Sequence, residues 1–356
     1  MVNIYRSLIT LFFGALGGAL FYYLKTPLPW LLGAFFATLI ITVTTGSLRI
    51  DSKFRMIAMP VMGVLVGSSF QPDIIDHLMI WPAGLAAAAF YTIFSSIVGF
   101  YYFTRIAKWD NPTALCAAPP GGLAEMVSIA GEIGADERRV ILTHSIRIAI
   151  VVVLATFTIQ YILDFNTTDM LAPLDIPAPI SLVEWLILGA CAVTGGYLGP
   201  KLGLPGGAIL GAKLVSAGVH IVGISDASPP NWIVATVQIV LGASLGVRFL
   251  GITKHEATSF AVHSAIWSII LLSIAFALAA ILSPLIGFDQ RALFLGFAPG
   301  GFSEMLLVAL AIGIESAFVA TCHVIRLIAI FICVPLAASL LQRHKNEQFN
   351  KRDLSN

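Results

Sequence analysis

Ten runs of apolar residues decide what this chain of 356 residues can fold into. Each run is roughly 17 to 27 residues long, enough for a helix to cross the hydrocarbon layer of a bilayer. Only 11% of the residues are charged, against about 25% in a soluble domain. The sequence therefore predicts an all-α polytopic membrane protein in contact with the lipid bilayer. The expected spans cover residues 6–24, 28–46, 54–70, 78–104, 138–163, 183–200, 205–224, 231–249, 258–285 and 316–341.

The chain also repeats itself. Residues 120–147 and 299–326 are identical at 12 of 28 positions when they are aligned at an offset of 179. A composition as apolar as this one predicts about three matches by chance. We therefore expect two copies of one unit, each with five spans. The predicted organisation is repeat unit one at 1–163, a linker at 164–181, repeat unit two at 182–342 and a cytoplasmic tail at 343–356.

A Pro-Gly-Gly segment separates the fourth and fifth spans of each unit, at 120–122 and at 299–301. Proline and glycine interrupt helices, so each segment is expected to be a broken helix. New helices should begin near Leu123 and Phe302. The N-terminus of such a helix has free N–H groups and a positive dipole end, which favour an anion or a carboxylate.

The positions of Lys and Arg predict how the two units lie in the membrane, because these residues accumulate on cytoplasmic loops. If both Pro-Gly-Gly segments enter the membrane and return, fifteen Lys and Arg, including Arg55 and Arg248, fall on one side and two, Lys25 and Arg291, on the other. If both segments cross, the counts are 11 and 6. The sequence thus favours re-entrant segments. Five spans per unit then give two inverted repeats with both termini cytoplasmic, a plan found in many secondary transporters.

Two glutamates follow the broken helices at the depth where charge is costly. Glu125 and Glu304 lie in the first turn of the helix after each break. In one interpretation each only caps its own helix. In the other they bind a coupling proton or cation, since carboxylates at this depth are rare and usually functional. The glycines of the two breaks are candidate binding residues with them: Gly121, Gly122, Gly300 and Gly301.

A histidine and an arginine recur in the fifth span of each unit. Arg147 and Arg326 lie about 14 Å from the start of that span, near mid-bilayer. A buried arginine stays charged and needs a partner, and a glutamate of either unit is the expected one. The pair could be a static strut, or the arginines could hold an anionic substrate. His144 and His323 lie one turn earlier on the same face; they are either interfacial or involved in proton coupling. Lys213, a weaker candidate, is expected to extend to the membrane interface.

The repeated A-P-G-G-(L/F)-(A/S)-E-M motif, followed by H-x-x-R in the next span, resembles the bacterial AbrB membrane family. The resemblance covers essentially the whole chain as two copies of that family's duplicated domain. It implies a role in regulating gene expression, and the family is also labelled ammonia monooxygenase. Copper or iron chemistry needs clustered His or carboxylate ligands, whereas the seven histidines here are scattered. We therefore expect no enzyme activity, no metal and no cofactor.

The function predicted from these features is secondary transport of a small polar or anionic solute, coupled to a proton or another ion. The site would lie at the midplane of the bacterial inner membrane, between the two Pro-Gly-Gly segments. The alternative is a membrane sensor that influences gene expression through a partner, as the family label implies. A net charge of +1 suggests no nucleic-acid partner. The sequence does not exclude that the protein forms a homo-oligomer.

Overall fold

The computed structural model describes residues 4–26, 28–68, 70, 81–163, 180–204, 207–251 and 254–353. Within these residues the regular structure is helical throughout, and no strand occurs. Seven helices are long and apolar enough to cross a membrane. The chain thus has the character of a multi-pass membrane protein. Most of the expected linker at 164–181 lies outside the described residues, as do the side chains of Ala124, Glu125, 254–259 and 341–353.

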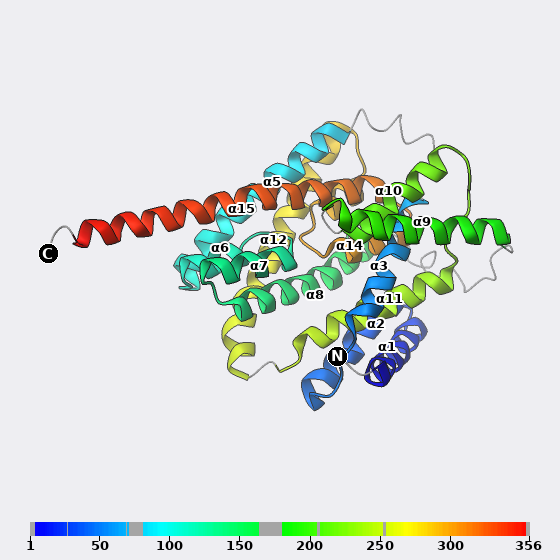
Figure 1. Cartoon of the computed structure of the whole chain (residues 1–356), viewed down its shortest axis with the longest axis horizontal. Helices are drawn as coiled ribbons and strands as arrows, with labels where there is room; N and C mark the ends of the chain where they lie inside the picture. Colours follow the sequence, from blue (N-terminus) through cyan, green and yellow to red (C-terminus); the bar gives the residue numbers. More distant parts are fainter. Residues whose placement is uncertain are drawn as a thin grey trace.

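The two repeat units contain the same succession of elements (Figure 1). Unit one comprises α1 (Ile4–Tyr23), α2 (Pro29–Thr45), α3 (Ser52–Gly67), α5 (Trp81–Tyr101) with the π-helical turn η1 (Tyr102–Ile106), α6 (Asn111–Ala117), α7 (Leu123–Ile133) and α8 (Glu137–Tyr161). Unit two comprises α9 (Leu182–Lys201), α10 (Gly207–Ile221), α11 (Asn231–Gly246) with the 3-10 turn η3 (Val247–Phe249), α12 (Lys254–Ile286), α13 (Gln290–Phe297), α14 (Phe302–Ala311) and α15 (Ser316–Asp353). We call residues that the repeat alignment pairs repeat twins.

Each expected span coincides with a helix, although four of these helices are short; one of them, α11, has 16 residues and is lengthened by η3. Helices α2, α3 and α10 have 17, 16 and 15 residues, below the roughly 20 that a perpendicular span needs. The expected tail is not separate from the last span, because residues 343–353 continue α15. Figure 1 shows this end of α15, in red, extending beyond the rest of the bundle.

Both Pro-Gly-Gly segments interrupt a helix where the sequence predicts it. The new helices begin at Leu123 and Phe302, as expected. Gly122 precedes the first of them with a φ of 67°, a left-handed conformation that strains residues with a Cβ atom. Gly301 precedes the second with an extended backbone, at a φ of −72°. The two breaks therefore differ in backbone conformation although their sequences match.

Helices α1, α2, α3, α9, α10 and α11 pack closely together, and we call them the glycine-packed group. A Cβ atom on Gly17 would collide with the backbone oxygen of Gly33, and the reverse also holds. Their repeat twins, Gly195 and Gly211, meet in the same way. Small residues allow helix backbones this approach inside membranes, so these glycines hold α1 against α2 and α9 against α10.

The other helices, α5 to α8 and α12 to α15, form the broken-helix group. Its centre is the crossing of the repeat-twin helices α5 and α12. Tyr91 donates from its hydroxyl to the backbone oxygen of Leu271 at 2.9 Å, and Tyr102 stacks on Trp267 with ring centroids 5.5 Å apart. The later residue of α5, Tyr102, thus contacts the earlier residue of α12, Trp267. These two helices are therefore antiparallel.

Contacts between the two repeat units are reciprocal. Gly63 on α3 meets the backbone oxygen of Ile209 on α10, and its repeat twin Gly242 on α11 meets that of Leu31 on α2. Both approaches are too close for a Cβ atom. Each half therefore presents the same surface to the other.

Candidate functional site

Each broken helix returns to the place where it began. In unit one the backbone N–H of Asp136, after α7, donates to the Thr113 hydroxyl near the start of α6 at 2.9 Å. In unit two Phe288, before α13, packs on Phe318, after α14, with ring centroids 4.6 Å apart. The four short helices thus form two hairpins, and the Pro-Gly-Gly segments are their tips.

The two histidines fix the first half of each hairpin. His144 on α8 donates from Nε2 to the backbone oxygen of Cys116 at 2.8 Å. His323 on α15 donates to that of Leu295 at 3.0 Å. The last carbonyls of a helix have no partner within the helix, and cationic or imidazole side chains are suited to bind them. The histidines therefore cap the short helices α6 and α13.

The two arginines bind the breaks themselves. Arg147 donates from Nη1 to the backbone oxygen of Pro119 at 2.6 Å, and Arg326 donates to that of Ala298 at 2.7 Å. Arg326 donates further to Gly300 at 3.0 Å. We expected a glutamate as the partner of each arginine. Within the described residues the partners are backbone carbonyls, which each helix break leaves free beside the guanidinium. The side chain of Glu125 lies outside these residues, so its pairing with an arginine stays a prediction.

His323 is held as a neutral imidazole. Its Nε2 donates to a carbonyl, and its Nδ1 lies 2.6 Å from Nη2 of Arg326. A guanidinium nitrogen can only donate, so Nδ1 must accept and carries no proton. The Nδ1 atom of His144 differs from that of His323, because it is buried and has no hydrogen-bond partner among the described residues. Both histidines are fully buried, so the interfacial interpretation is wrong.

A cavity of about 400 Å³ lies between the two hairpin tips. Seven of the ten residues predicted for the site line it. Its wall includes Gly121, Gly122, Gly300, Gly301, Arg147, Arg326 and Glu304. The cavity is therefore built from both repeat units. The histidines are absent from the wall and act behind it through the helix ends.

Glu304 folds back over the start of its own helix. It is 4% exposed, and its Oε2 accepts from the Ser303 hydroxyl at 2.9 Å. A Cβ atom on Gly301 would displace this carboxylate from its place. Within the described part of the chain Glu304 forms no ion pair. The side chain of Glu125 lies outside the described residues, so its predicted pairing stays a prediction.

Two further arginines line the cavity from the glycine-packed group. Arg55 comes from the first turn of α3 and Arg248 from η3. We expected both on cytoplasmic loops. Neither has a charged repeat twin, since Arg55 aligns with Val234 and Arg248 with Ser69. Comparison of the two units therefore could not reveal them.

Lys213 on α10 does not reach the surface. It is 4% exposed, and its Nζ lies 4.8 Å from the centre of the Phe70 ring. The prediction that it extends to the membrane interface is therefore wrong. At the corresponding place in the other half, Phe35 packs on Phe249 with ring centroids 6.5 Å apart. In unit two, the position of Phe35 is thus taken by Lys213, and the face of the Phe70 ring stabilises this buried cation.

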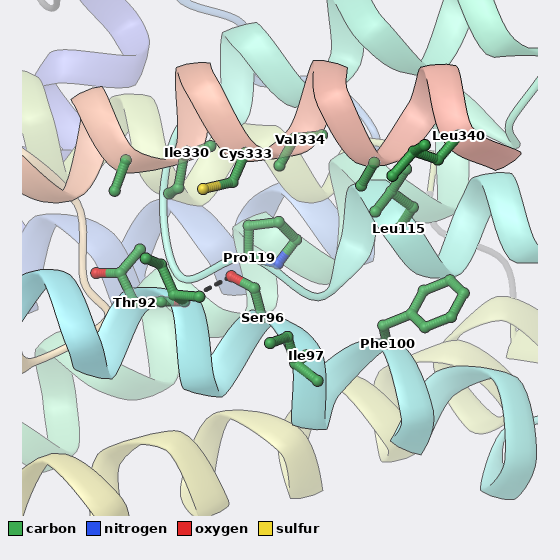
Figure 2. Close-up of a pocket in the computed structure, with 13 residues that line it drawn as sticks. Thr92, Ser96, Ile97, Phe100, Leu115, Pro119, Ile330, Cys333, Val334 and Leu340 are labelled. Atoms are coloured by element: carbon green, nitrogen blue, oxygen red, sulfur yellow. Dashed lines mark hydrogen bonds between the residues drawn. The ribbon is translucent and has the colours of Figure 1, made fainter.

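A separate groove of about 360 Å³ lies behind the tip of the first hairpin, between α5, α6 and α15. Figure 2 shows Pro119 between Ser96 on α5 and Ile330 on α15, with Leu115 near one end. The wall is mostly apolar, and Ser96 already donates to the backbone of Thr92 at 2.7 Å. This groove offers packing space and few polar contacts.

Hairpins that meet at a charged cavity inside a bundle of apolar helices define the class of this protein as a multi-pass helical membrane protein. The family model described as "Transition state regulatory protein AbrB" matches residues 30–342. The chain therefore belongs to the AbrB family.

Two relatives resemble it over most of their length. One, from Bacillus subtilis (strain 168), bears the name "Uncharacterized protein YhjN"; it is 25% identical over 98% of this chain and 97% of its own. The other, from Escherichia coli (strain K12), bears the name of regulator AbrB; it is 24% identical over 89% of this chain and 91% of its own. The regulatory alternative rests on these names alone.

Proposed function

We propose that this protein is a secondary transporter that moves a small polar or anionic solute through the cavity between its two hairpin tips. The observation that carries the proposal is that broken helices from both repeat units line one cavity with buried charges. Irregular backbone at membrane depth is tolerated where it lines a cavity or is buried in protein. Paired broken helices at the interface of two repeats form the binding site in many secondary transporters.

The proposed orientation places the two hairpins in the membrane from opposite sides. Each hairpin returns to its starting side in the fold, which supports re-entrant segments. The antiparallel crossing of α5 and α12 supports inverted repeats. With Arg55 and Arg248 assigned to the cavity, thirteen Lys and Arg remain on one side against two on the other. This asymmetry supports a cytoplasmic position for both termini in a bacterial cell.

In this proposal Glu304 binds the coupling proton or cation, and Glu125 has the same role in the other hairpin. A carboxylate in the wall changes the charge of the cavity when it takes up or releases a proton. Glu304 is buried and forms no ion pair within the described residues, although arginines line the same cavity. Loading of the site can thereby depend on the proton gradient.

Solute flux into proteoliposomes, measured with and without a pH gradient, tests the proposal. Glu304→Gln keeps the shape and much of the capping capacity but cannot release a proton. We expect this variant to fold normally and to lose pH-dependent flux, and we expect the same of Glu125→Gln. Glu184→Gln is the control, because Glu184 caps the start of α9 at an exposed position. If the two cavity variants keep the flux and pH dependence of the original protein, the hairpin tips are structural.

A further inference from the structure

The two repeat-twin arginines differ in how fully they are bonded. Arg326 donates to the backbone oxygens of Ala298 and Gly300 and to His323. Arg147 is 2% exposed and donates only to Pro119 within the described residues. A guanidinium has five N–H donors, so most of those on Arg147 are unused. Within the described residues Nε has no hydrogen-bond partner on either arginine, so the difference between them lies in their Nη groups.

Such an arrangement is unfavourable for an empty site. Buried polar groups are nearly always hydrogen-bonded, and a buried charge without a partner is destabilising. Arg326 increases the cost, because its positive charge acts directly on Arg147. Arg147 lines the cavity, so a molecule bound there can reach its free donors.

A second arginine with an unused hydrogen-bond donor lines the same cavity. Nη1 of Arg248 is also buried, and no hydrogen-bond partner for it occurs in the part of the chain that the structure describes. Arg248 lies on η3, which contacts α8, and Arg55 lies close enough to affect its charge. Among the described side chains of the wall, four arginines stand against one carboxylate, Glu304. The cavity therefore has an excess of positive charge.

From these contacts we propose that the transported solute is a small organic dianion, and that Arg147 rather than Arg326 is its main ligand. This inference rests on the proposed transport function. One acidic group, a carboxylate or a phosphate, accepts from the unused Nη N–H groups of Arg147. The other is bound on the opposite wall by Arg248 and Arg55. Planar guanidinium groups suit both kinds of oxygen anion, and about 400 Å³ is within the usual size of small-molecule sites.

In this assignment Arg326 is a positioning residue. Its bonds hold the second hairpin tip, and a Cβ atom on Gly121 of the first tip would lie 3.1 Å from its Nε. Arg326 therefore keeps the two tips in place. The two arginines perform different tasks, although the sequence gives them the same motif.

Binding to the purified full-length protein in detergent, measured by calorimetry, tests the solute class. The probes are succinate, butyrate as a monoanion of the same length, succinamide as a neutral analogue, and inorganic phosphate. We expect succinate or phosphate to bind, butyrate to bind more weakly, and succinamide not to bind. Preference for phosphate over succinate identifies phosphate groups, and the reverse identifies carboxylates. Binding of succinamide as tight as that of succinate would overturn the proposal.

Variants of the arginines test the assignment of the ligand. Arg147→Lys loses the planar fork and should weaken binding of the dianion at least about tenfold. Arg326→Lys should lower the melting temperature and weaken binding less than Arg147→Lys does. Arg291→Lys, on the surface beside Asp289, should change neither. If Arg147→Lys does not fold, Arg248→Gln provides the test, because it removes the opposite anchor. An equal or greater loss of binding in Arg326→Lys contradicts the assignment.

The two proposals fail in different ways. If no anion of the panel binds while proteoliposomes take up a neutral or cationic solute in a pH-dependent manner, the dianion is excluded and transport stands. If succinate or phosphate binds through Arg147 and no flux of either occurs, the anion site stands and transport is excluded.

Discussion

At the scale of single residues, the main role of the repeated His-x-x-Arg motif is to stabilise the broken helices. In both units the histidine and the arginine bind backbone oxygens that lie 28 positions earlier in the chain. Duplication of the motif is thus explained by duplication of the break. Direct contact with a solute is left to the donors that the breaks do not use, and within the described residues Arg147 has more of these than Arg326.

His323 provides a test of this structural role. Replacing His323 by Ala leaves the backbone oxygen of Leu295 buried without a donor, which should lower the free energy of unfolding by about 1–3 kcal/mol. His323→Gln should restore part of the loss, because an amide can both donate and accept. Thermal unfolding in detergent measures both effects. The pH dependence of flux should be unchanged in His323→Gln, and its loss would show that the histidine carries the coupling proton.

At the scale of helices, the close packing of the glycine-packed group can be tested at one position. Gly33→Ala places a methyl group against the backbone oxygen of Gly17, and overpacking of this kind costs about 1–3 kcal/mol. The melting temperature should fall accordingly. Gly189→Ala, in α9, is the matched control, since nothing lies within 4 Å of its added carbon. Helix propensity alone would raise the stability of the control, so a fall of equal size there would show that the contact at Gly33 does not decide the result.

The apolar groove behind the first hairpin gives a prediction of the opposite sign. Leu115 lines this groove (Figure 2), whereas its repeat twin Phe294 is fully buried and packs on Phe276 with ring centroids 5.7 Å apart. Leu115→Phe should fill part of the groove and stabilise the fold by about 0.5–2 kcal/mol. Differential scanning fluorimetry of the purified protein measures the shift. A lower melting temperature would show that a larger side chain does not fit there.

Much of the helical plan could be predicted because its determinants are local. Proline and glycine set the helix starts at Leu123 and Phe302. The partners of the arginines could not be predicted, because a backbone oxygen looks the same in every sequence and becomes available only after the hairpin folds. Arg55 and Arg248 were missed for a related reason. They reach the cavity through contact between the two helix groups, which neither hydropathy nor repetition reports.

At the scale of the whole molecule, the proposed orientation predicts the sides on which two segments lie. Thr168→Cys in the linker and Ser355→Cys in the tail would be made in a protein whose partly buried Cys333 is replaced by serine. An impermeant thiol reagent should label position 168 in intact cells and position 355 only after lysis. Labelling of both positions on the same side would exclude inverted repeats.

The bonds between the fifth span and the break of each unit also limit how the molecule can move. Each break is tied to α8 or α15 by at least two buried hydrogen bonds from side chains, so we expect each hairpin to move together with its helix. The cavity wall, in contrast, joins the two helix groups, with Arg55 and Arg248 on one side and the hairpin tips on the other. We expect any movement of the hairpins relative to the glycine-packed group to occur along this boundary. In the proposed transport, a displacement along this boundary would open the cavity without breaking either hairpin, and the bound anion would move together with the hairpins.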